Sequence, residues 1–207
     1  MKKLNRIGAE AVISEVTFEG KKVVQKKRSA KNYRNSLLDS GIRKKRTRAE
    51  AKIITEVSSV VCVPRIISVD ENKGIILMEL IKGKRLKEVI EKNPSLCVIA
   101  GKEIKKIHSL GIIHGDLTTS NIIVEESANG GRNKKQKASV LCFIDFGLGF
   151  YSKKLEAVAT DLVVFKKTFN ATHSSLKNGW TLVMKGYAPS KELEAQMQKI
   201  EKRARYH

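Results

Sequence analysis

The sequence predicts an α+β fold of two lobes, a small strand-rich lobe over residues 1–80 and a larger, mainly helical lobe over residues 81–207. Apolar and polar residues alternate over much of residues 3–27, which is the period of half-buried strands. A long helical period follows, and helical patterns dominate after Gly83. A chain of 207 residues is long enough for one or two small lobes that share a core.

The first lobe is expected to contain a hairpin, one long helix and a second pair of strands. "EAVISEVTF" and "VVQKK" flank a polar turn at "EGKK". Ala49, Ile53 and Val57 recur at i, i+4 and i+8, so residues from about 35 to 61 should form a helix with one buried face. Pro64 forces a break, and "RIISVD" and "GIILMEL" then have the composition of strands joined by a polar turn at "ENKG".

The second lobe begins with two helical segments. "LKEVIEKN" ends at Pro94, and "SLCVIAGKEIKKIHSLG" is an amphipathic helix that Gly111 terminates. Two short apolar strands follow, "NIIV" and "VLCFID", and the polar residues 127–139 between them are expected to form a mobile loop. Residues from about 153 to 207 are expected to be helical, with a charged tail.

The composition is typical of a folded soluble protein in a reducing compartment. Hydrophobic residues make up 41% of the chain, and no apolar run approaches the roughly 20 residues that span a bilayer, so no membrane association is expected. Glu10 follows the basic start too closely for a secretory signal. Cys62, Cys97 and Cys142 are odd in number and contain no CxxC pair, which predicts buried thiols rather than disulfides or a zinc site. The expected location is the cytoplasm and also the nucleus.

The net charge of +20 is concentrated near the N-terminus. Residues 21–52 contain thirteen lysines and arginines and two acids, an excess of +11. Clustered cations gain affinity for polyanions by releasing counterions from phosphates, although a solvated helix face or a localisation signal has the same composition. RNA is the preferred polyanion, with no DNA specificity evident, and contact should be mainly with backbone and shape because Tyr33 is the one aromatic residue in the segment. The candidate RNA-binding residues are Arg43, Lys44, Lys45, Arg46 and Arg48.

Two motifs in the second lobe supply the parts for phosphoryl transfer. "HGDLTTSN" at residues 114–121 is followed by "FIDFGLG". Asp116 can accept a proton from an attacking hydroxyl, while Asn121 and Asp145 can offer the oxygen ligands that Mg²⁺ prefers. His114 is expected to orient the loop by hydrogen bonds rather than to touch substrate. Each motif alone is weak, but the two in this order indicate an Mg-ATP site.

The first lobe should then provide a lysine for the phosphates and a carboxylate that holds it. Lys26 and Lys27 are adjacent on a predicted strand, so they point to opposite faces and either could be the internal one; Lys26 is preferred. Glu50 on the long helix is the expected partner, unless it is a plain surface acid. The phosphate-covering loop is a poor match, because "IGAEA" has the single glycine Gly8.

"GAEA", "KNYRN", "HGDLTTSN" and "DFGL", in this order in so short a chain, resemble the PRPK-type atypical kinases, the kinase/ATPase subunits of KEOPS (EKC) complexes. The similarity runs from about residue 7 to residue 187. It implies a minimal two-lobed kinase fold, binding of ATP and Mg²⁺, and serine/threonine kinase or ATPase activity. It also implies work beside a tRNA threonylcarbamoyltransferase subunit and other KEOPS subunits, on the tRNA adenosine next to the anticodon.

The resemblance also assigns residues. The family's lysine falls on Lys26 and its helix glutamate on Glu50. Its catalytic aspartate falls on Asp116, and its metal ligands fall on Asn121 and Asp145.

Further family positions concern the hinge and the large lobe. "ILMELIKG" matches the hinge, so the backbone around Glu79 and Ile81 should meet adenine, and Asp161 matches a position that supports the large lobe. The C-terminal "RARYH" matches the family's usual Arg, Gly and Lys run only in part, and the 127–139 loop is unusual.

Two other functions are compatible with parts of the pattern. Aminoglycoside or choline kinases share H-G-D and the spacing to asparagine, but this chain lacks the helical insert that encloses their substrates. A non-enzymatic adaptor for RNA and a partner could retain a kinase shell. About 60 residues follow D-F-G and no A-P-E closes an activation segment, which favours ATP hydrolysis coupled to a partner over broad peptide phosphorylation.

Overall fold

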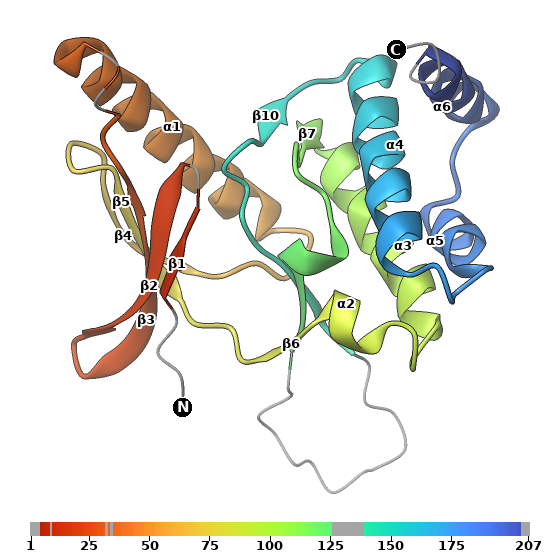
Figure 1. The fold of residues 1–207 in the computed structure, drawn as a ribbon, viewed down its shortest axis with the longest axis horizontal. Helices are drawn as coiled ribbons and strands as arrows, with labels where there is room; N and C mark the ends of the chain where they lie inside the picture. Colours follow the sequence, from red (N-terminus) through yellow and green to blue (C-terminus); the bar gives the residue numbers. More distant parts are fainter. Residues whose placement is uncertain (1–4, 9, 32, 34, 126–138, 204–207) are drawn as a thin grey trace, which may run out of the picture. The chain divides into compact units, whose positions relative to one another are not determined.

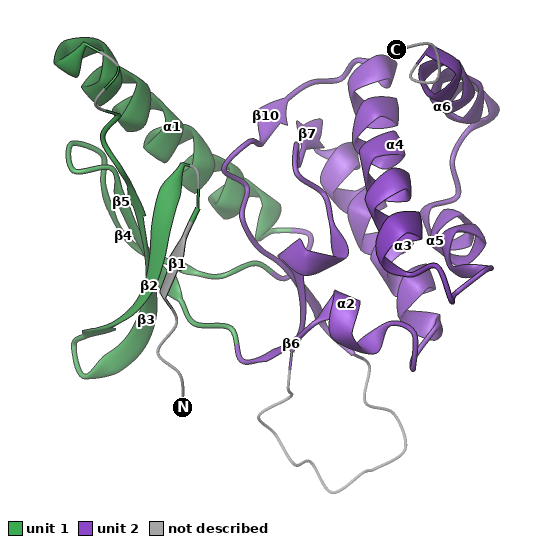
Figure 2. Cartoon of the chain, viewed as in Figure 1, with its two compact units in different colours: residues 1–59, 63–81 green, residues 60–62, 82–207 purple. Residues whose placement is uncertain are grey.

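The computed structural model forms two compact units, which are described separately (Figure 2). The first unit contains residues 1–59 and 63–81, and the second contains residues 60–62 and 82–207. The structure describes residues 5–8, 10–31, 33, 35–125 and 139–203. The predicted mobile loop at 127–139 lies outside these residues except for residue 139, as do the last four residues of the C-terminal tail.

The first unit is an antiparallel five-stranded sheet with the order β1-β2-β3-β5-β4 and one helix (Figure 1). Its elements are β1 (Asn5–Ile7), β2 (Ala11–Phe18), β3 (Lys21–Arg28), α1 (Ser36–Val57), β4 (Ile66–Asp70) and β5 (Ile75–Glu79). The β2–β3 hairpin pairs without slippage from Ala11 opposite Arg28 to Phe18 opposite Lys21. Its two-residue turn has φ of 48° at Glu19 and 73° at Gly20, the left-handed backbone that tight hairpins need. The predicted hairpin is confirmed.

Helix α1 begins at a capped N-terminus. The Asn35 side chain accepts hydrogen bonds from the backbone N–H groups of Leu37 (3.0 Å) and Leu38 (3.4 Å). The buried face of the helix includes Ile53, Ile54 and Val57. Ile53 and Val57 belong to the predicted apolar stripe, whereas its first member, Ala49, is exposed. The helix packs beside β4 and β5, and its buried Ala51 joins a small apolar cluster with the two strands.

The helix ends four residues earlier than its apolar period predicts. The cause is a strand-like pairing of the segment Val60–Cys62, which belongs to the second unit. Cys62 forms a parallel bridge with Cys142, and the Phe143 N–H donates to the Cys62 carbonyl at 2.8 Å. Since backbone pairing satisfies these groups, the segment leaves the helix. Cys97 and Cys142 are buried as expected, whereas Cys62 is partly exposed.

The second unit joins small sheets to a set of helices (Figure 1). A three-stranded sheet has the order β6-β8-β9, and β10 pairs with β7. The elements are β6 (Gly83–Arg85), α2 (Leu86–Val89), α3 (Ser95–Ser109), β7 (Ile112–Ile113), the 3₁₀ turn η1 (Thr119–Asn121), β8 (Ile122–Glu125), β9 (Leu141–Phe143), β10 (Phe150–Tyr151), α4 (Leu155–Thr172), α5 (Gly179–Tyr187) and α6 (Lys191–Arg203). Helix α2 is shorter than "LKEVIEKN" predicts, because the N–H groups of Lys92 and Asn93 both turn back to the Val89 carbonyl.

Two glycines permit close packing of α3 against α5. A Cβ atom on Gly101 would collide with the Val183 carbonyl, and one on Gly186 would collide with the Val98 carbonyl. The two helix backbones therefore meet at positions where neither has a side chain. Helix α3 ends at the predicted Gly111, whose φ is 72°. Among the described residues, the structure contains no helix that is both long and apolar enough to cross a membrane.

Candidate active site

The loop between β7 and β8 carries Asp116 and Asn121 and holds them in contact. The Asn121 Nδ2 group donates to the Asp116 backbone carbonyl at 2.9 Å and to its Oδ2 atom at 3.0 Å. The η1 turn, in which the Asn121 N–H donates to the Thr118 carbonyl at 3.0 Å, brings the two residues together. Because the amide nitrogen faces the carboxylate, the Asn121 Oδ1 atom is the group that can bind a cation.

Asp161 on α4 anchors the start of this loop. Its Oδ2 atom accepts the His114 backbone N–H (3.1 Å) and lies 3.1 Å from the His108 Nε2 atom, while its Oδ1 atom accepts the Gly115 N–H (3.0 Å). Burial raises the pKa of this carboxyl, but the His108 hydrogen bond and the neighbouring histidines outweigh burial and hold the pKa below its ordinary value. The structure thus puts Asp161, 3% exposed, where an ionised group fixes the loop backbone.

His114 connects the loop to the D-F-G segment. Its Nε2 atom lies 3.2 Å from the Ile144 carbonyl, and the Asp116 N–H donates to its Nδ1 atom at 3.3 Å. Both contacts are met by the neutral tautomer with a proton on Nε2. Burial lowers the pKa of the ring, which favours this neutral form. The ring also packs on Phe146, with centroids 4.5 Å apart, so one buried side chain orients both motifs.

Asp145, the aspartate of D-F-G, has an unusual backbone. Its φ is 65°, in the left-handed region that residues other than glycine rarely adopt. The flanking groups fix it: the Ile144 N–H donates to the Asn121 carbonyl at 2.9 Å, and Phe146 is 1% exposed. Strain of this kind persists only where the surroundings determine it, and it clusters at functional sites.

Gly115 is required by geometry at a position where the sequence pattern gave no reason for it. Its φ is 78°, and a Cβ atom there would collide with the Leu148 carbonyl. The loop therefore passes directly over the backbone that follows D-F-G. This close contact between the two backbones explains why glycine is needed at the middle position of H-G-D.

A row of hydrogen bonds, which the sequence reasoning missed, supports the middle of the loop and runs from buried Thr119 and His173 to the exposed Glu91. The Thr119 Oγ1 atom lies 2.9 Å from His173 Nε2, and His173 Nδ1 lies 3.3 Å from Glu91 Oε1. Thr119 and His173 are 3% and 2% exposed. The two contacts join residues that are 54 and 82 positions apart in the sequence, so no local spacing could have revealed them. Their burial indicates a role in positioning the loop.

In the first unit, Lys26 and Glu50 form a buried ion pair. The Lys26 Nζ atom lies 2.5 Å from Glu50 Oε1, and the residues are 6% and 2% exposed. Lys27 is exposed, so the two neighbours on β3 do point to opposite faces and Lys26 is the internal one. Glu50 is not a plain surface acid.

Arg28 and Glu10 extend this pair, and neither was predicted. Arg28 follows Lys26 on the same face of β3, and its Nη2 atom lies 2.6 Å from the second Glu50 oxygen. Its Nη1 atom lies 3.3 Å from the Glu10 carboxylate, which also pairs with Arg46. Side chains on one face of a strand recur at every second residue, so Arg28 could have been predicted from Lys26. No sequence pattern pointed to Glu10.

The remaining predicted nucleotide contacts are backbone positions. Gly8 is exposed in a tight turn, where its N–H donates to the Ala11 carbonyl at 2.9 Å. The Glu79 N–H at the end of β5 donates to the Arg65 carbonyl at 2.9 Å. Ile81 follows in an extended segment with its side chain half-buried.

The five candidate RNA-binding residues do not form one array of unmatched charge. Arg43 pairs with Asp39 (2.7 Å), Arg46 with Glu10 (2.5 Å) and Arg48 with Glu71 (2.6 Å). Lys44 donates to the Asn72 side chain at 3.2 Å, and Lys45 is exposed. Asp39 lies one helical turn from Arg43, whereas Glu10 and Glu71 lie outside residues 21–52. The +11 excess counted over that segment therefore overstates the positive electrostatic potential of this surface.

The oxygen ligands available suit magnesium rather than a dedicated metal cage. Over the described part of the chain, no group of three or more His, Cys, Asp and Glu side chains could hold a metal ion. Asp145 and Asn121 provide one carboxylate and one amide oxygen. Mg²⁺ commonly takes one or two such ligands and completes its shell with water and phosphate oxygens, so the residues present fit it.

The RIO-domain family profile matches residues 12–130. KEOPS complex subunit Bud32 of Pyrococcus abyssi is 38% identical over 223 residues, which cover 99% of this chain and 96% of that protein. A "Probable bifunctional tRNA threonylcarbamoyladenosine biosynthesis protein" of Methanobrevibacter smithii is 42% identical over 96% of this chain. The chain spans only 36% of that longer relative.

Among solved structures, the fold resembles the Rio2 kinase of Chaetomium thermophilum in a complex with ADP, Mg²⁺ and phosphoaspartate. The TM-score is 0.66 at 16% identity, over 99% of this chain and 71% of that chain. The likeness confirms the predicted α+β kinase-like fold.

Proposed function

Because the chain belongs to the Bud32 family of RIO-domain kinases, we propose that it binds Mg-ATP and transfers or hydrolyses the terminal phosphoryl group in support of threonylcarbamoyl modification of tRNA. The observation that carries the proposal is the contact between Asp116 and Asn121, beside the D-F-G motif that begins with the strained Asp145. One residue that accepts a proton and two that offer metal ligands are what phosphoryl transfer requires of a protein.

Asp116 accepts the proton of the attacking hydroxyl, from water or from a serine or threonine side chain. The Asn121 amide holds the carboxylate in position through its 3.0 Å hydrogen bond. Asp145 and the Asn121 Oδ1 atom would hold Mg²⁺, which would neutralise charge on the phosphates. His114 stays neutral, so it adds no positive charge next to Asp116 and acts by orientation.

Lys26 binds the phosphates, and Glu50 fixes its ammonium group. The pair is formed and buried in the structure, so little reorganisation is needed before the nucleotide binds. Adenine meets the Glu79 carbonyl and the Ile81 N–H, and the Gly8 turn lies over the phosphates. These contacts follow the family's kinase pattern.

Hydrolysis coupled to a partner is favoured over phosphorylation of many peptides. The chain has no A-P-E after D-F-G, so a peptide-docking platform of the ordinary kind is missing. The proposed partners are a tRNA threonylcarbamoyltransferase subunit, other KEOPS subunits and tRNA, in the cytoplasm and also the nucleus. Support comes from the KEOPS subunit that the chain resembles and from the bifunctional relatives, in which a similar segment is part of a longer chain.

ATP turnover of the purified chain, with and without the partner subunit and tRNA, tests the proposal. We expect stimulation by the partner, and Asp116→Asn should lower turnover by about 10²–10⁴-fold because the proton acceptor is lost. Asp145→Asn should lower turnover and raise the Mg²⁺ concentration needed for half-maximal turnover, because a charged metal ligand is lost. Lys45→Gln, on an exposed side chain of α1, is the control and should retain turnover. Unchanged turnover in both aspartate variants would refute the assignment.

A further inference from the structure

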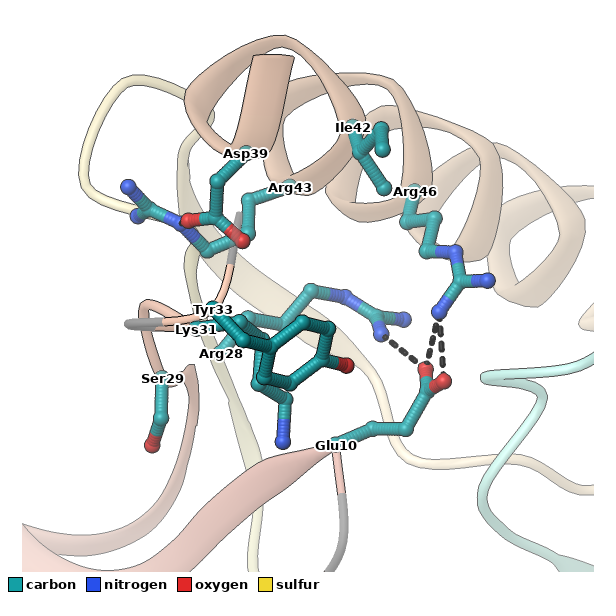
Figure 3. A pocket seen from close by; sticks show the side chains of 9 residues that line it. All are labelled: Glu10, Arg28, Ser29, Lys31, Tyr33, Asp39, Ile42, Arg43 and Arg46. Carbon is teal, nitrogen blue, oxygen red and sulfur yellow. Dashed lines mark hydrogen bonds and ion pairs between the residues drawn. The ribbon is translucent and has the colours of Figure 1, made fainter. Parts of the chain in front are cut away.

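The first unit contains a pocket of about 240 Å³ between β3, the segment after it and the first half of α1 (Figure 3). One water molecule needs only about 10–15 Å³ of such space, so the pocket can hold a larger group. None of the residues that carry the proposed phosphoryl transfer lines it. We propose that this pocket is a second binding site of the chain, for a small phosphate-bearing anion.

The lining is positively charged. Arg28, Lys31, Arg43 and Arg46 contribute four cations, against the carboxylates of Glu10 and Asp39. The excess of two positive charges matches the charge of a phosphate monoester. Guanidinium groups also present planar forks of donors that suit phosphate oxygens.

Glu10 indicates where the anion binds. Its carboxylate lies between two guanidinium groups from different elements, 3.3 Å from Arg28 Nη1 on β3 and 2.5 Å from Arg46 Nη1 on α1 (Figure 3). Burial raises the pKa of this carboxyl, but the Arg46 hydrogen bond and the cationic neighbours outweigh it and keep the pKa low. The two arginines thus converge on one anionic group, and Glu10 occupies the position that a phosphate would take.

Glu10 can leave this position, whereas Arg28 cannot. The Glu10 side chain is 42% exposed, so it can turn to water at small cost, while the Arg28 side chain is 4% exposed and fixed by Glu50. Arg28 Nε is buried and has no hydrogen-bond partner in the structure, so the guanidinium retains an unmet donor. The pocket therefore has a fixed, buried cation, Arg28, next to a carboxylate, Glu10, that can move away. A bound anion would compete with this carboxylate for the arginines.

The ligand could be free phosphate or the phosphate of a larger molecule, and two probes separate these sources. We would titrate the full chain with inorganic phosphate and with ribose 5-phosphate, with ribose as the uncharged control, at constant ionic strength and without Mg²⁺ or nucleotide. Nuclear magnetic resonance signals of the arginine Nε–H groups would report binding at Arg28 and Arg46. Tighter binding of ribose 5-phosphate would identify a ligand larger than phosphate. Equal affinities would identify the phosphate group alone.

Three variants decide whether the pocket is the site. Arg46→Gln should weaken phosphate binding about tenfold or more, since it removes a charge-assisted contact. Glu10→Gln should tighten binding several-fold, because the competing carboxylate loses its charge. Lys22→Gln is the control, since Lys22 is on β3 in the same unit but pairs with Glu15 outside the pocket. The control should leave the affinity unchanged.

Three results would overturn the proposal: non-saturable shifts of the arginine signals, weakening in Arg46→Gln no greater than in Lys22→Gln, or weaker binding in Glu10→Gln. The chain's role in ATP turnover is tested with separate residues and with Mg²⁺ present. Failure of the anion site is therefore distinguishable from failure of the proposed function.

Discussion

The catalytic loop of the second unit and the charged network of the first are held in place by different means. Around the loop, a single carboxylate, Asp161, receives two backbone N–H groups and contacts the His108 ring, all in a buried setting. In the network, each carboxylate is shared between two cations: Glu50 contacts Lys26 and Arg28, and Glu10 contacts Arg28 and Arg46. The loop therefore depends on one residue for its shape, whereas the network depends on the balance of its charges.

The largest expected effect is the loss of the loop's anchor. Asp161→Ala should lower the free energy of unfolding by about 3–5 kcal/mol, because it removes one partner of a buried pair and leaves backbone donors unmet. Urea unfolding would measure it. Glu103→Ala, which breaks an exposed pair with Lys106, should change the free energy by less than about 1 kcal/mol. Similar losses in the two variants would show that the buried Asp161 anchors the loop no more strongly than an exposed ion pair stabilises α3.

The next effect separates the two adjacent lysines of β3. Lys26→Met should reduce ATP turnover by about 10²–10³-fold, the usual result of removing one preorganised group that stabilises transition-state charge. Lys27→Met is the matched control on the opposite face and should retain near-normal turnover. Equal losses would show that the internal position of Lys26 does not matter for the reaction.

A smaller effect is expected at the middle of the loop. Thr119→Val keeps the shape of the side chain but leaves the Nε2 atom of buried His173 without its partner, which should cost about 1–3 kcal/mol of unfolding free energy. Thr118→Val, on the half-buried neighbour, is the control. If Thr119→Val lowered turnover without lowering stability, Thr119 would have a direct part in the reaction instead.

The smallest effect is a pH dependence from His114. The pKa of the folded ring lies below its ordinary value of 6.5, so below about pH 6.5 the unfolded chain binds a proton that the folded chain does not. Stability should therefore fall as the pH decreases from 6.5 toward the folded pKa. Asp161 contributes in a separate window, because its lowered pKa gives stability that is lost only as the pH falls below its ordinary value of 3.8.

Urea unfolding between pH 7.5 and pH 4.5 would measure the histidine effect. His114→Gln should be less stable than the natural chain at pH 7.5 but should show a weaker dependence on pH in this range. An unchanged pH dependence would mean that the ring binds protons equally in the folded and unfolded chains, which would contradict the lowered pKa.

The sequence predicted residues that are close along the chain better than residues that are close only in space. Asp116 and Asn121 lie in one octapeptide, so their contact follows from a short loop. On β3 the period of two left Lys26 and Lys27 as alternatives, and only packing puts Lys26 inside. Glu10 and His173 meet their partners across 36 and 54 positions, for which no local rule exists.

The basic segment is the reverse case, in which a strong local signal leaves out the acids that fold against it. Counting charges over residues 21–52 could not include Glu10 and Glu71, which lie outside that window and pair with Arg46 and Arg48. Of its arginines, Arg28 is one of the most deeply buried charged residues described. A run of like charges in a sequence therefore says little about surface potential until the acids that fold against it are known.

The ion pairs of the first unit form a single row in which the signs alternate: Lys26, Glu50, Arg28, Glu10, Arg46. Such a row begins and ends with a cation, so it is one negative charge short of neutrality. A phosphate at the Lys26 end would supply that charge, and so would one at the Arg46 end. If Glu50, Arg28 or Glu10 loses its charge, the residues on either side of it have like charges and no opposite charge between them. The row should therefore tolerate the loss of an adjacent cation–anion pair better than the loss of either residue alone.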